Sequence, residues 1–289
     1  METGFPIAQN ESIPNIDFYR GAFEKIKRYA GERDYNKLMK AYLEIFGTYP
    51  PNIFQVADGD LLMVGKMYRV VFEEKIMNLD KNKLDSFSHP PSSITSQQRF
   101  NTMGSPVLYT ASDQHTAIAE TAKGSYGKSF YLSTWEFVKD IPLTYMMLFY
   151  KNHFNNQSLK DLSDTVETKL DGMLHIYDKE KIEALKYYFE HLTTYSLKDP
   201  FDNLTSAIGH YYFYKFKAER IPPLGFICYP SLKMKRDCLN YALHPKLISE
   251  RVLVCTGIEK RILISQDETK THAPIEVMGK IQNDGTIVW

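Results

Sequence analysis

The feature that most constrains the fold is a helical block at about residues 156–219, which has strand-like segments on both sides in the sequence. Apolar residues recur there at three- and four-residue spacing, which is typical of an amphipathic helix, in "DKEKIEALKYYFEHLTTY". A second helix is predicted over "NLTSAIGHYYFYKFKAE". The sequence therefore predicts an α+β protein whose mixed β core carries a helical insertion at about residues 140–219.

The N-terminal part also has a helical pattern. Apolar side chains at helical spacing predict one helix from Ile16 to Tyr29 and a second over residues 34–46. Gly47 and the pair Pro50-Pro51 are expected to end the second helix. We interpret residues 1–60 as a helical extension and residues 61–289 as the main domain.

Short segments rich in β-branched and aromatic residues predict the strands of the core. The polar segment "HPPSSITSQQ" is expected to be a loop, and "SDQHTAIAETA" a helix capped by Ser112 or Asp113. A hairpin is expected at the C-terminus, with Asn283-Asp284-Gly285 as its turn. The predicted strands are "MYRVVF", "PVLYTA", "SFYLSTWEF", "RVLVCTGI" and "RILIS", together with "LGFICYPS", which is expected to run into a turn.

The composition argues against several classes of protein. The 35 basic residues equal the 35 acidic ones, whereas nucleic-acid binders usually have a basic excess, so we expect no direct contact with nucleic acid. The longest apolar stretch, "IPLTYMMLFY", is about half a membrane span, and no signal peptide is recognised. The three cysteines, Cys228, Cys238 and Cys255, fit buried thiols better than disulfides or a zinc site. We therefore expect a cytoplasmic protein without membrane or metal binding.

No common catalytic motif is present: the chain lacks a phosphate loop, GxGxxG, HExxH and GxSxG. The 8 histidines do not cluster at the spacing of metal ligands. His115 lies in a predicted helix, where a packing or surface role is the more frequent one.

Several polar residues nevertheless occupy strand or strand-to-helix positions. Arg69 lies within "MYRVVF", where a buried charge is costly unless it is paired or faces a ligand. Structural explanations remain open for four of these residues: an ion pair between Arg69 and Glu120, a core position for Tyr109, and a cap or turn for Ser231. The full set is Arg69, Arg99, Tyr109, Glu120 and Ser231.

The order of these residues resembles the RES domain. The matching segments are "MYRV", "RFN" with "PVLYTA" and "TAIAE", and "GFICYPS" followed by "LNYALHP", over about residues 62–249. Members of that family look like NAD-degrading bacterial toxins with a fold similar to ADP-ribosyltransferases. The resemblance implies that Arg69, Arg99, Tyr109, Glu120 and Ser231 form the NAD site, with Ser129 as a further match.

Each of these residue types suits NAD cleavage. Arginines hold phosphate oxygens two at a time, so Arg69 and Arg99 could bind the diphosphate. Glu120 could stabilise the positive charge that develops on the ribose, as a carboxylate does in glycoside cleavage. A stacking role on the nicotinamide ring is expected for Tyr109, and a hydrogen bond to the amide or a phosphate for Ser231. We expect Glu120, Arg69 and Tyr109 to be catalytic.

The nucleophile stays open, because water would give hydrolysis and inorganic phosphate would give phosphorolysis. NAD is expected as the substrate and no cofactor is expected. Two alternatives remain: an ADP-ribosyltransferase acting on a macromolecule, and a non-catalytic domain that only binds a partner. The resemblance also implies a helix-turn-helix antitoxin as partner. The N-terminal helices and the insert could form a dimer face or a lid.

Overall fold

The computed structural model describes most of the chain between residues 13 and 289. The described residues are 13–46, 53–55, 64–76, 79–122, 125–139, 141–148, 157–172, 177–196, 202–217, 222–231, 233–234, 238–267 and 270–289. Gly47, Pro50 and Pro51, which were predicted to end the second helix, lie outside these residues.

Contacts divide the chain into two compact units, each of which is built from several segments. The first unit comprises Met1–Val56, Thr95–Ser105 and Pro142–Pro230, and the second comprises Ala57–Ile94, Pro106–Ile141 and Ser231–Trp289. The N-terminal helices and the helical insert thus belong to one unit, although they are more than 100 residues apart in the sequence.

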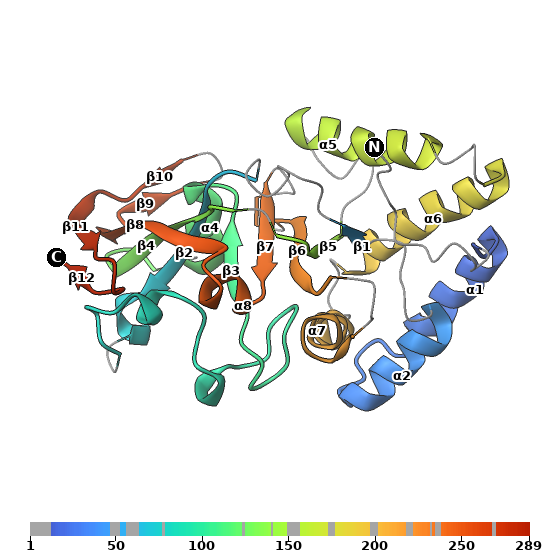
Figure 1. Cartoon of the computed structure of the whole chain (residues 1–289), viewed down its shortest axis with the longest axis horizontal. Helices are drawn as coiled ribbons and strands as arrows, with labels where there is room; N and C mark the ends of the chain where they lie inside the picture. Colours follow the sequence, from blue (N-terminus) through green and yellow to red (C-terminus); the bar gives the residue numbers. More distant parts are fainter. Residues whose placement is uncertain are drawn as a thin grey trace. The chain divides into compact units, whose positions relative to one another are not determined.

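Helices dominate the first unit (Figure 1). Both predicted N-terminal helices are confirmed, and α1 packs on α6 while α2 packs on α7. Buried aromatic side chains such as Tyr42, Tyr188 and Tyr212 fill the space between these helices. The helices are α1 (Ile16–Lys27), α2 (Tyr35–Phe46), α5 (Gln157–Gly172), α6 (Lys179–Ser196) and α7 (Asp202–His210), and a π-helical turn (Tyr211–Lys215) follows α7.

The first unit also contains three strands: β1 (Ile53–Gln55), β5 (Thr144–Met147) and β6 (Leu224–Pro230). β5 pairs antiparallel with β1 and parallel with β6. The insertion expected from about residue 140 therefore begins with a strand. A run as short as "TYMM" has too few residues for either helical or strand periodicity to be recognised.

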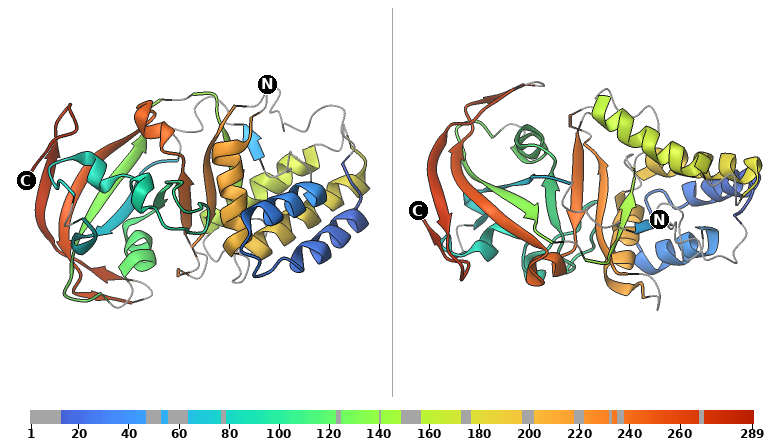
Figure 2. Two further views of the ribbon diagram at one scale, coloured as in Figure 1. Left: turned by 90° about the horizontal axis from the view of Figure 1, so that it is seen from below. Right: turned by 45° about the horizontal axis from the view of Figure 1, so that its top comes forward.

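The second unit is an antiparallel sheet with the strand order β7-β3-β2-β4-β8-β11-β12. In both views of Figure 2, β8 and β11, in orange to red, lie side by side. The strands are β2 (Met67–Phe72), β3 (Leu108–Ala111), β4 (Ser129–Phe137), β7 (Leu239–Leu243), β8 (Leu253–Ile262), β11 (Ile275–Ile281) and β12 (Ile287–Val288), and β9 (Ser265–Gln266) pairs with β10 (Thr271–His272).

The remaining helices of the second unit are short. They are the 3₁₀ helices η1 (Glu73–Ile76), η2 (Leu84–Phe87) and η3 (Ser92–Ile94), and the α-helices α4 (Gln114–Ala122) and α8 (Lys246–Ser249). η3 interrupts the polar segment that was expected to be a loop.

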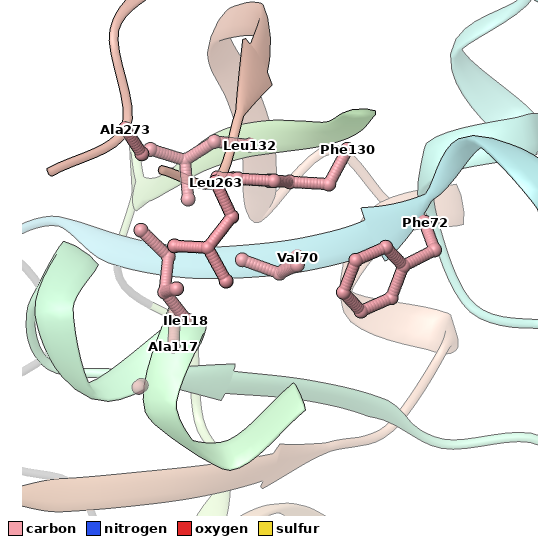
Figure 3. Packing of buried hydrophobic residues seen from close by; sticks show 9 residues of the cluster. Val70, Phe72, Ala117, Ile118, Phe130, Leu132, Leu263 and Ala273 are labelled. Carbon is pink, nitrogen blue, oxygen red and sulfur yellow. The ribbon is translucent and has the colours of Figure 1, made fainter. Parts of the chain in front are cut away.

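One helix, α4, covers one face of this sheet (Figure 3). Ala117 and Ile118 of α4 pack against Val70 and Phe72 of β2 in a cluster that also contains Leu132 of β4. A second cluster, with Val71 of β2 among its members, fills the opposite face. The alternation of β2 thus divides its side chains between the two faces, as in a strand buried on both sides.

The C-terminal hairpin is confirmed, since β11 pairs antiparallel with β12 and Gly285 adopts φ 82° in the turn. "RVLVCTGI" and "RILIS" were expected as two strands, but one strand, β8, runs from Leu253 to Ile262. Its pairing with the whole length of β4 holds it continuous, and one register shift is absorbed at Thr134/Trp135. The chain is an α+β protein. No helix among the described residues has the length and apolar character needed to cross a bilayer.

Candidate functional site

Hydrogen bonds fix the junction between β3 and α4, the helix that carries the Glu120 carboxylate. Asp113 caps α4, as predicted, by accepting hydrogen bonds from Thr116 N (2.8 Å) and Thr116 Oγ1 (2.6 Å). Ser112 ties the same junction to β7, because its N donates to Leu239 O (2.8 Å) and its Oγ accepts from Leu239 N (3.2 Å). The helix therefore begins at a defined position relative to β3 and β7.

Glu120 lies on α4, and two neutral donors hold one oxygen of its carboxylate. Ser231 Oγ donates to Glu120 Oε1 at 2.5 Å, and Asn240 Nδ2 donates to the same oxygen at 2.8 Å. Within the described part of the chain, Glu120 Oε2 has no hydrogen-bond partner. The carboxylate is thus anchored through one oxygen, while the other remains available for a ligand.

Ser231 follows β6 and is completely buried. Its backbone N donates to Cys238 O (2.8 Å), and its Oγ accepts from Met234 N (3.2 Å) while donating to Glu120. Ser231 is therefore a turn residue, as the structural alternative expected, and also a direct partner of Glu120. Its single hydroxyl proton is donated to Glu120 and is therefore not available to a ligand.

Arg69 is a half-buried cation without an acidic partner among the described residues. One guanidinium nitrogen donates to Tyr109 O at 3.3 Å, while Nε is buried and has no partner. Burial lowers the pKa of Arg69 to about 10, and the Tyr109 phenol acts in the opposite direction. Arg69 is still cationic at neutral pH, and the ion pair with Glu120 that was considered as an alternative does not form.

The pairing between β2 and β3 explains where Arg69 lies. The two strands pair at a single position, Tyr68↔Ala111, so the Arg69 side chain reaches the Tyr109 carbonyl where the ladder has ended. The side chains of Arg69 and Val70 leave opposite faces of β2, and Val70 packs towards α4. The structure therefore brings Arg69 to the Tyr109 carbonyl, and Glu120 to Ser231 and Asn240, but no hydrogen bond or ion pair between described residues joins these two groups.

Arg99 belongs to the first unit, where it lies in a turn closed by Gln98 and Asn101 (the Arg99 turn). Helix α7 holds the chain around this turn at three points: Gln97 Nε2 to Asn203 Oδ1 (2.7 Å), Ser206 Oγ to Asn101 O (2.8 Å), and Thr102 Oγ1 to His210 Nδ1 (3.0 Å). Gly209 allows this contact, because a Cβ there would lie 2.3 Å from Phe100 O.

The structure does not bring Ser129 to Glu120. Ser129 begins β4, and its Oγ donates to Glu276 Oε2 in β11 at 3.2 Å. His115 is half-buried, and its Nδ1 lies 2.5 Å from Thr271 Oγ1. Cys228 and Cys255 are buried as predicted, Cys238 is partly buried, and all three are free thiols.

Asn240 is the site residue that the sequence interpretation missed. A signal for it existed, because an amide in the buried strand "LNYAL" is as unusual as the arginine in "MYRVVF". Among the described residues, no cluster of His, Cys, Asp and Glu could hold a metal ion. The residues present offer a fixed carboxylate, a desolvated cation and an aromatic ring.

One comparison places the chain in a known family. A model of the RES domain matches residues 67–259, which is more than half of the chain and includes Arg69, Arg99, Tyr109, Glu120, Ser231 and Asn240. A search of curated proteins finds no match. The family match is consistent with an NAD-related role.

Proposed function

Because this chain belongs to the RES domain family, we propose that it is an enzyme that cleaves the bond between nicotinamide and ribose in NAD. The observation that carries the proposal is the carboxylate of Glu120, which is held through Oε1 by Ser231 and Asn240 and keeps Oε2 free of described partners. A preorganised negative group of this kind is what a sugar cation requires.

In the proposed reaction, the C–N glycosidic bond breaks and nicotinamide departs with the electron pair. The leaving group is neutral once it has accepted these electrons, so no general acid is needed. The ribose carbon becomes positively charged in the transition state, and Glu120 stabilises that charge or holds a ribose hydroxyl. The nucleophile then adds to the same carbon: water, which loses a proton, gives ADP-ribose, and phosphate gives its 1-phosphate.

The surroundings of Arg69 favour the proposal that the substrate is an anion. Arg69 has a buried Nε without a partner and no acidic partner among the described residues, so its guanidinium could donate hydrogen bonds to a phosphate oxygen. Tyr109 next to it supplies an aromatic ring for the nicotinamide, a contact worth on the order of 1 kcal/mol with a cation. Arg99 is proposed as a second phosphate ligand.

The direct test is to incubate the purified chain with NAD, with and without inorganic phosphate, and to identify the products by mass. Loss of NAD with release of nicotinamide is expected, and ADP-ribose or its 1-phosphate identifies the nucleophile. Label transferred from NAD to an added protein or nucleic acid would instead indicate a transferase. Folded protein that leaves NAD intact under both conditions would contradict the proposal.

We also propose a toxin role, with a helix-turn-helix antitoxin that blocks NAD access. The family match motivates this partner. Expression of the wild-type chain alone should deplete cellular NAD and stop growth, whereas Glu120→Gln should be tolerated. Normal growth with abundant, folded wild-type protein would count against the toxin role while leaving the NAD assay to decide the activity.

A further inference from the structure

We propose that Asn240 is a positioning residue that orients the Glu120 carboxylate, an inference that rests on the proposed cleavage of NAD. Asn240 lies in β7, where all five residues are buried. Its side-chain amide donates to Glu120 Oε1 at 2.8 Å, and Glu120 is the only described residue to which it forms a side-chain hydrogen bond.

The position of the Asn240 amide is set by its strand. Asn240 pairs with Ala111 in the register between β7 and β3, and the neighbouring Leu239 bonds to Ser112 at the start of α4. Burial of an amide costs free energy, on the order of 1–3 kcal/mol, unless a hydrogen bond compensates it. The bond to Glu120 supplies that compensation, so the sheet holds a donor at a fixed point beneath the helix.

Two donors converge on one oxygen, and they come from separate segments. Ser231 is held by Cys238 and Met234, and Asn240 is held by the strand ladder. A carboxylate with both donors on Oε1 has one preferred rotation, which directs Oε2 away from Ser231 and Asn240. Hydrogen bonds to an ionised acceptor are also stronger than neutral ones.

The kinetic consequence follows from preorganisation. A carboxylate that is already oriented stabilises the developing ribose charge without reorganising in the transition state. Without the Asn240 amide, Ser231 alone would hold Glu120, and the carboxylate could rotate. The loss should appear in kcat, because NAD binding through the arginines does not depend on this orientation.

The test uses a double-mutant cycle in the full chain. Asn240→Ala should lower kcat roughly 10-fold and leave KM for NAD within about twofold. Asn240→Asp should lower kcat further, because it places a second carboxylate beside Glu120. In a Glu120→Gln background, Asn240→Ala should cause little additional loss, since a residue that acts through Glu120 has no carboxylate left to orient.

Ser88→Ala is the matched control, because it removes a buried hydroxyl of the same unit that has no hydrogen-bond partner, and it should keep wild-type kinetics. Unchanged kcat in folded Asn240→Ala, or an equal loss in both Glu120 backgrounds, would overturn the inference. If the wild-type chain turns over no NAD, the proposed function itself fails and the role of Asn240 fails with it. Turnover by wild type with no effect of Asn240→Ala removes the inference alone.

Discussion

Ser231 Oγ and Glu120 Oε1 form a 2.5 Å hydrogen bond between residues 111 positions apart in the sequence. The bond joins the turn after β6 to the helix that follows β3. Because Ser231 is completely buried, this contact forms only when the two segments are folded against each other. The orientation of the proposed catalytic carboxylate therefore depends on the tertiary fold rather than on α4 alone.

Glu120→Gln should abolish most NAD turnover with little effect on folding. The amide keeps the size of the side chain and can still accept hydrogen bonds from Ser231 and Asn240, but it carries no charge. Removal of one preorganised electrostatic group typically costs about 100-fold or more in kcat. Nicotinamide release and the melting temperature should be measured together. A variant with normal turnover would show that Glu120 is not the carboxylate that stabilises the sugar.

Arg69→Met should raise stability and weaken NAD binding at the same time. Burial of the guanidinium Nε without a hydrogen-bond or acidic partner is costly, and methionine fills a similar space without charge. We expect the free energy of unfolding to rise by about 1 kcal/mol in a denaturant titration. KM for NAD should increase at least about 10-fold if Arg69 binds a phosphate oxygen.

Arg69→Lys is the matched variant for this prediction. Lysine keeps the positive charge but cannot hold two phosphate oxygens with one planar group, so it should recover only part of the affinity. A stability loss in Arg69→Met would mean that the hydrogen bond to Tyr109 O outweighs the cost of burial.

Gly209→Ala should lower stability, because α7 packs closely against the Arg99 turn. An added Cβ would lie 2.3 Å from Phe100 O, so α7 or the chain around the turn must move. Gly21→Ala in α1 is the control, because nothing lies within 4 Å of its Cβ position. That variant should be more stable by roughly 0.5–1 kcal/mol, the usual gain of alanine over glycine in a helix. Equal melting temperatures for the two variants would contradict the close approach.

Stability should fall as the pH drops from about 6.5 towards 4, partly because of His244. Burial, followed by Lys246 and His89, lowers the pKa of His244 to about 4, and Glu250 acts in the opposite direction. Its Nδ1 accepts a hydrogen bond from Lys246 N, so protonation would remove an acceptor. Between these pH values the unfolded chain binds a proton that the folded chain does not, which costs the folded state on the order of 1–3 kcal/mol.

His244→Gln is the variant that tests this assignment. A glutamine side chain does not titrate, so the difference in unfolding free energy between pH 7 and pH 4.5 should be smaller than in the wild type. Denaturant titrations at the two pH values measure that difference. An identical difference in both proteins would assign the acid sensitivity to other groups.

The sequence predicted the elements whose patterns are local. α1, α2, α4 and β2 follow from periodicity, cap residues and strand composition, and Asp113 caps α4 as expected. β5 was not predicted, because its four residues carry too little periodicity, and its pairing partners lie far away in the sequence.

The candidate site was predicted only as a set of residue types. Glu120, Ser231, Arg69 and Tyr109 were selected from their unusual contexts and from the family resemblance. The resemblance could not show that Ser231 donates to Glu120, because that contact depends on how the turn after β6 packs. Asn240 was overlooked although an amide in an apolar strand is unusual, and "LNYAL" does not indicate which neighbour that amide contacts.

The family match ends at residue 259, inside β8, and it begins after both helices α1 and α2. An expression fragment cut to those limits would split a strand that pairs with β4 and β11, and it would strip the cover from buried aromatic rings such as Tyr188. Such a fragment should aggregate when produced, so recombinant work on this protein needs the flanking segments on both sides.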